Sequence, residues 1–147
     1  MKSLWEASTR AEMSARLARL SPAETARWGR MTAPRMVSHL TQSLRSSIGE
    51  LPVKSKNLPL RYSPIKEIII YWLPFPKNAP TAPELLALEP SDWATDVARL
   101  QDLLQRFATK DQNGAWPEHA AFGRLSGKQW GILMYRHTDH HFRQFGV

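Results

Sequence analysis

Hydrophobic positions in this chain recur at intervals of three and four residues, the spacing of helices with one buried face. Between Ser3 and Leu20 the apolar stripe consists of Met13, Leu17 and Leu20. From Thr32 to about Gly49 it consists of Met36, Leu40, Leu44 and Ile48. The pattern therefore predicts a long amphipathic helix in each of these segments.

Two more long helices are predicted in the second half of the chain. The segment from Ser91 to about Lys110 has apolar residues at Trp93, Val97, Leu100, Leu103, Leu104 and Phe107. A further helix begins after Ser126, which forms a capping box with Gln129, two side chains that satisfy each other's backbone N–H groups. Its inner row is Trp130, Met134, His137, His141 and Phe145.

Prolines are frequent between Leu51 and Pro90 and forbid long regular elements there. We interpret this segment as a crossover between the second and third long helices, with one short helix or strand at Ile65 to Leu73. Its apolar residues are numerous enough to need a core: Ile68, Ile69, Ile70, Trp72 and Phe75.

A short helix is predicted to start at Ser21, because Ser21 and Glu24 match a capping box and Pro22 suits the first helical position. It would end near Trp28. With four long amphipathic helices and no alternating strand pattern, the sequence predicts one all-α domain over residues 1–147, a four-helix bundle.

The composition limits which metal ligands the chain can offer and which partners its charge favours. There is no cysteine among the 147 residues, so histidine and carboxylate are the strong metal donors that remain. Lys and Arg number 20 against 13 Asp and Glu, a net charge of +7. This excess is spread along the chain, which favours a basic solvated surface or a small anionic substrate over nucleic acid.

No segment of the sequence is predicted to enter a membrane. The N-terminus has no apolar signal core, and the longest apolar run, Ile68 to Leu73, is too short to span a bilayer. We therefore expect a soluble cytoplasmic protein that acts on a small molecule. A homodimer is compatible with a small helical bundle, but no sequence feature predicts one.

Three histidines are candidate metal ligands. His137 and His141 are four positions apart, so on a helix their side chains lie on one face, in the row that Trp130 and Met134 direct inward. His39 lies at the margin of the apolar row of the second helix. Metal sites in helical bundles use side chains from facing helices, so these three could form a tripod; a hydrogen-bonded core pair is the alternative.

Four further residues near this block have open roles. His140 could replace one ligand, orient one through a hydrogen bond, or lie half-exposed beside Arg136 and Arg143. Asp139 is expected to face solvent, with orienting a ligand as the other option, and Gln144 is a candidate for contact with a ligand or the pocket. His119 either lines a pocket mouth or packs and caps its loop.

Several stretches resemble the DinB/YfiT-like superfamily of metal-dependent enzymes, in particular a small uncharacterised branch of it. The matching stretches are Trp28–Leu40, Leu73–Glu84, His119–Ser126 and the block from Trp130 to Gly146, which contains His137-Thr-Asp-His140-His141. The likeness covers most of the chain, and the histidine block is its most specific part. The branch usually has His-Pro where this chain has His119-Ala120.

The resemblance implies a four-helix bundle in which His39, His137 and His141 hold a divalent ion. Zinc or nickel is the leading choice, with iron or manganese as alternatives. It also implies a thiol transferase or isomerase that uses a low-molecular-weight thiol such as glutathione, bacillithiol or mycothiol. The metal would lower the pKa of that thiol or of water, and activation of water would make the enzyme a hydrolase instead of a thiol transferase.

Two other classes of function stay open. A non-catalytic metal- or ligand-binding module, such as a stress-related partner protein, would use the same histidines with a closed coordination shell. A nucleic-acid binder is suggested by the net charge, and salt-dependent affinity for random DNA would test it.

Overall fold

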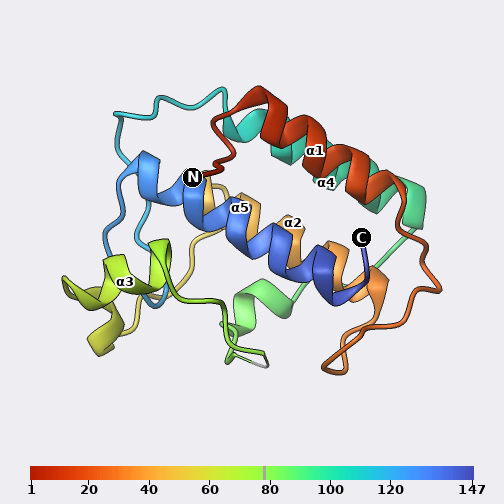
Figure 1. Ribbon diagram of the computed structural model, residues 1–147, viewed down its shortest axis with the longest axis horizontal. Coiled ribbons are helices and arrows are strands. Elements are labelled where there is room, and N and C mark those ends of the chain that lie inside the picture. The colour runs from red at the N-terminus through yellow and green to blue at the C-terminus, as the bar shows by residue number, and fades with distance from the viewer. Residues whose placement is uncertain (78) are drawn as a thin grey trace.

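The computed structural model describes residues 1–77 and 79–147, and within them the protein is all-helical, without a β-strand (Figure 1). The α-helices are α1 (Ala7–Ala18), α2 (Ala33–Ser47), α3 (Ile65–Tyr71), α4 (Trp93–Phe107) and α5 (Gly127–Gln144). Two short 3₁₀ helices, η1 (Pro59–Arg61) and η2 (Pro83–Leu86), lie in the segment between α2 and α4.

The four longer helices pack against one another. α2 contacts both α4 and α5, and α1 contacts the same two helices. Figure 1 shows α1, α2, α4 and α5 lying roughly along one direction, with α3 at one side. The colours of α2 and α5 run in opposite senses, so these two helices are antiparallel. Within the described residues, none of the helices combines the length and apolarity that a bilayer crossing needs.

The predicted apolar rows form the core. Met13, Leu17, Met36, Leu40 and Leu44 are almost completely buried, as the spacing predicts. The rows of α4 and α5 are buried at these positions: Leu100, Leu103, Leu104, Phe107, Trp130, Met134 and Phe145. The helical period of the sequence therefore identifies the buried face of each long helix.

Three of the long helices begin at side-chain caps. Thr32 accepts a hydrogen bond from the Arg35 N–H at 3.3 Å, and Asp92 accepts one from the Thr95 N–H at 2.9 Å. Ser126 and Gln129 form the predicted capping box at the start of α5. These caps satisfy N–H groups that have no partner inside the helix, and they fix where α2, α4 and α5 begin.

The first helix starts later than predicted, at Ala7, because the preceding residues pack on α5 instead. The Leu4 N–H donates to the Gly131 carbonyl at 3.1 Å, and Trp5 Nε1 donates to the Gly127 carbonyl at 2.8 Å. A Cβ on Gly131 would lie 2.4 Å from the Trp5 ring. The close approach of Trp5 to α5 thus requires glycine on this helix face.

The predicted helix at Ser21 is absent. Ser21 Oγ accepts from the Ala23 N–H at 3.2 Å, and the Ser21 carbonyl accepts from the Glu24 N–H at 3.1 Å, which makes a single turn. Most side chains between Pro22 and Trp28 are exposed. A capping motif without an apolar face to bury does not sustain a short helix.

The segment between α2 and α4 is only partly buried. The predicted element at residues 65–73 is a helix, α3, and of the five apolar residues expected in a core only Ile70 is fully buried. Ile69 and Phe75 pack partly against the core. Ile68 and Trp72 are 44% and 76% exposed, so the prediction was wrong for these two. α3 is short, and its contacts with α5 and with η1 leave Ile68 and Trp72 uncovered.

Candidate metal centre

Three histidines from two helices meet in the interior. His39 lies in the middle of α2, and His137 and His141 lie one turn apart on α5. The Nε2 atom of His137 is 3.0 Å from Nε2 of His39 and 3.1 Å from Nε2 of His141. The antiparallel packing of α2 and α5 brings together residues 98 positions apart. The structure therefore joins the three residues that the sequence indicated, and we call them the histidine cluster.

Burial keeps the histidine cluster uncharged near neutral pH. His39 and His141 are 3% and 9% exposed, and His137 is partly exposed. Burial lowers the pKa of His141 to about 3, with a further contribution from the neighbouring His39. Burial also lowers the pKa of His39, and it lowers that of His137 well below its usual value, assisted by His141 and His39. Neutral imidazole is the form that binds metal.

The proton on His39 is fixed by a backbone carbonyl. His39 Nδ1 lies 3.2 Å from the carbonyl oxygen of Leu85, in η2. A carbonyl only accepts, so Nδ1 carries the proton and donates it. In the neutral ring, Nε2 then has a free lone pair, which is directed towards His137. The segment between α2 and α4 thereby sets the tautomer of His39.

Gln144 fixes the proton on His141 in the same way. The Gln144 amide nitrogen donates to the Trp28 carbonyl at 2.8 Å, so the amide oxygen is the atom that faces His141. That oxygen is 2.8 Å from His141 Nδ1, which must therefore donate. Nε2 of His141 again presents a lone pair towards His137.

The protonation pattern leaves an excess of lone pairs at the centre. Nε2 of His39 and Nε2 of His141 are both acceptors, and both lie within hydrogen-bond distance of Nε2 of His137. His137 has at most one proton on that atom, so it can satisfy only one of its two neighbours. A cation would satisfy all three nitrogens, which makes the donor set suitable for a divalent metal ion.

The spacing of the three nitrogens also suits a metal. One nitrogen of each ring lies within 4.8 Å of those of the other two. Ligand nitrogens about 2.0–2.1 Å from a tetrahedral ion are about 3.3 Å from one another. The two contacts of 3.0 and 3.1 Å are close to this separation, so small side-chain rotations would suffice. The histidine cluster could hold a metal ion.

Phe75 covers one side of the histidine cluster. Its ring centroid lies 6.2 Å from that of His137 and 6.0 Å from that of His140. Arg136 lies over the Phe75 ring at 5.2 Å and donates to the backbone carbonyls of Ile69, Ile70 and Leu73. Arg136 thus ties the end of α3 to α5, and Phe75 lies two residues after Leu73, the last residue that Arg136 holds.

His140 lies beside the histidine cluster but is not one of its three converging donors. Its ring is 5.6 Å from Trp28 and 5.3 Å from His141, both in edge-on contacts. Of the sequence alternatives, the structure places it half-buried among aromatic rings, and it is not one of the three converging donors.

The other two candidate residues, His119 and Asp139, form contacts that hold the fold together. His119 Nδ1 accepts from the N–H groups of Ala121 and Phe122, at 3.0 and 3.2 Å, so this ring caps its own loop. Asp139 binds Arg16 at 2.7 Å and Arg143 at 3.0 Å. Its side chain is 15% exposed, so the expectation that it faces solvent was wrong. Neither residue contacts the three converging nitrogens.

Comparison with known families assigns the chain to one of them. Residues 6–146 match the family described as "Protein of unknown function (DUF1569)", and the chain belongs to this family. A search of curated proteins and a search of solved structures each found no match. The family match does not itself connect the chain to the DinB/YfiT superfamily, so that resemblance stays a prediction.

The role of Gln144 leads to a test. Replacing Gln144 with methionine removes the acceptor for His141 Nδ1 and leaves the Trp28 carbonyl without its donor. Loss of such an orienting contact typically weakens metal affinity 10- to 100-fold, and we expect a decrease of about that size for Zn²⁺. Competition with a chromophoric chelator measures it. Gln101→Met, at a partly exposed position on α4, serves as the control; equal affinity in both variants would contradict the role of Gln144.

Proposed function

We propose that this protein binds one divalent metal ion through Nε2 of His39, His137 and His141. The observation that carries the proposal is the convergence of three Nε2 atoms while both His39 and His141 donate their Nδ1 protons elsewhere. We further propose that the fold is a four-helix bundle of the DinB/YfiT type, with residues 51–90 as its crossover. The packing of α1, α2, α4 and α5 supports this.

Zinc or nickel is the leading choice of ion, with iron or manganese as alternatives, because the donors are three neutral imidazoles. Three protein ligands are typical of catalytic sites, which keep a position for water or substrate. A metal bound here would lower the pKa of a coordinated thiol or water molecule. The protein's own contribution is to keep the imidazoles neutral and oriented, through burial and through Leu85 and Gln144.

An enzyme is favoured over a non-catalytic module by one feature of the structure. A cavity of about 470 Å³ opens beside His39, so a small molecule could reach the histidine cluster. Transfer of a thiol to a small electrophile is the reaction that the family resemblance implies. The cytoplasmic location and the thiol remain predictions from sequence, and a homodimer is only compatible with a bundle of this size.

Metal analysis of the purified chain tests the proposal. With any histidine tag removed, we expect about one equivalent of bound metal per chain, and one equivalent of Co²⁺ after removal and replacement. The Co²⁺ protein should have the intense visible bands of a four- or five-coordinate ion. A chain that binds no Co²⁺ above the level of nonspecific surface sites would overturn the proposal. An exchangeable water on the metal would separate an enzyme from a closed structural site.

A further inference from the structure

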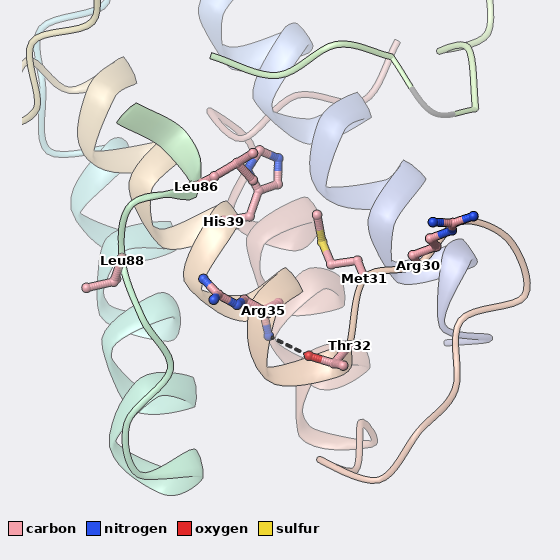
Figure 2. Close-up of a pocket in the computed structure, with 7 residues that line it drawn as sticks. All are labelled: Arg30, Met31, Thr32, Arg35, His39, Leu86 and Leu88. Atoms are coloured by element: carbon pink, nitrogen blue, oxygen red, sulfur yellow. Dashed lines mark hydrogen bonds between the residues drawn. The ribbon is translucent and has the colours of Figure 1, made fainter. Parts of the chain in front are cut away.

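The cavity beside His39 is built from three parts of the chain (Figure 2). Arg30 and Met31 come from the loop before α2, Arg35 and His39 come from α2, and Leu86 and Leu88 come from the segment that follows α3. Figure 2 shows Arg30 and Leu88 at opposite sides of the cavity, with Arg35 and His39 between them. Its volume of about 470 Å³ is in the range of small-molecule sites.

The residues that line this cavity carry positive charge only. Arg30 and Arg35 are lining residues, and no acidic side chain is among them. Arg35 pairs with Glu89 at 2.7 Å, but the two side chains are 44% and 72% exposed. Ion pairs this exposed contribute little stability, so an anionic ligand could take the place of Glu89 at small cost.

Arg35 and His39 are positioned to bind two ends of one molecule. They are four residues apart on α2, so their side chains project from the same face, about 6 Å apart along the helix axis. Apolar side chains line the cavity between and around them: Met31, Leu86 and Leu88. A guanidinium at one end, His39 of the histidine cluster at the other and an apolar wall fit a short amphiphilic ligand.

The second cavity next to α5 is a weaker candidate. It has a volume of about 420 Å³ and is lined by Arg136, Arg143, Asp139 and His140, among others. Arg136 is occupied by the carbonyls at the end of α3, and Arg143 is paired with Asp139 at 3.0 Å. Both arginines of this second cavity therefore already have acceptors there, and Asp139 adds a negative charge to its lining, whereas the cavity beside His39 has no acidic lining residue and its Arg35 pairs only with the exposed Glu89.

We propose that the cavity beside His39 binds a small organic carboxylate, held at its anionic end by Arg35 with Arg30, while its other end reaches the histidine cluster. This inference rests on the proposed metal site and names the class of substrate for it. Three neutral imidazoles leave the charge of a bound dication uncompensated, which adds to the preference for an anion.

A matched pair of probes tests the carboxylate. The full-length protein is loaded with Co²⁺ and titrated with 3-mercaptopropionate and with 3-mercaptopropan-1-ol, which have the same thiol and the same chain length. A thiol is chosen because its binding to Co²⁺ produces a near-ultraviolet charge-transfer band that can be followed directly. We expect 3-mercaptopropionate to bind about tenfold more tightly, as one charge-assisted contact provides.

Two arginine variants complete the test. In Arg35→Gln the tenfold preference should disappear, while affinity for 3-mercaptopropan-1-ol stays the same. Arg45→Gln is the control, because Arg45 lies on the same helix, is 37% exposed, pairs with Glu50 and does not line the cavity. The preference should persist in this control.

The outcomes separate the two proposals. If Co²⁺ does not bind, the metal site itself is wrong. If Co²⁺ binds and both thiols bind equally, or if Arg35→Gln and Arg45→Gln behave alike, the metal site stands and the carboxylate site is overturned. Since Arg35 is half-exposed and outside the core, its substitution is not expected to unfold the protein.

Discussion

Replacing His137 with alanine is expected to lower the affinity for Zn²⁺ by at least about 100-fold, because Nε2 of His137 lies between the other two Nε2 atoms of the histidine cluster, 3.0 Å from that of His39 and 3.1 Å from that of His141. Loss of a group that merely orients a ligand weakens affinity 10- to 100-fold, so loss of a ligand should reach or exceed that range. The fold should survive, because His137 is partly exposed and its Nε2 can satisfy only one of the two neighbouring acceptor nitrogens even in the wild-type protein.

The measurement combines metal affinity with unfolding. At a Zn²⁺ concentration 100 times its Kd, the wild-type protein should gain about 2.7 kcal/mol of stability from the metal, and His137→Ala should gain almost none. His140→Ala is the matched control, because it removes a histidine of the same helix that does not converge on the centre. A His137→Ala protein that binds Zn²⁺ as tightly as His140→Ala would exclude the histidine cluster as the metal site.

Acid should destabilise the metal-free protein strongly. In the folded state burial lowers the pKa of His119 to about 4 and that of His141 to about 3, whereas both are near 6.5 when unfolded. Between these values the unfolded chain binds more protons, so the free energy of unfolding falls as the pH falls below 6.5. At pH 5 each histidine lowers it by about 2 kcal/mol relative to pH 8, or about 4 kcal/mol together.

Urea unfolding at pH 8 and pH 5, with a chelator present, measures this loss. His119→Asn separates the contribution of one ring, since the asparagine side chain places an oxygen where His119 Nδ1 accepts from Ala121 and Phe122. The variant keeps the cap but does not titrate. We expect its loss of stability on acidification to be about 2 kcal/mol smaller. An equal loss in both proteins would show that His119 is not held neutral by burial.

The helices and the three converging histidines were accessible from sequence because both follow from the helical period. The row Trp130, Met134, His137 and His141 repeats every three or four residues, so any fold that buries Trp130 turns the two histidines inward. His39 was a candidate from its place at the margin of the apolar row of α2, and the family resemblance implied the same three ligands; spacing within α5 alone cannot say which other helix faces it.

Other features could not be predicted, because they depend on tertiary contacts. The sequence pattern predicted Ile68 and Trp72 to be core residues, yet the contacts of α3 with α5 and η1 leave both exposed. Ser21 and Glu24 fit a capping box, but the residues after them have no apolar face to bury. A local motif such as a capping box permits a helix to start, but a short helix forms only where it can bury an apolar face.

The partner that orients His39 is also invisible to sequence patterns, because it belongs to the main chain. The Leu85 carbonyl is present whatever side chain stands at position 85, so that position is free to vary while the tautomer of His39 is preserved. Relatives could therefore reshape the walls near Leu86 and Leu88 without losing the orientation of this ring. Substrate range can diverge in such an arrangement while the metal chemistry stays constant.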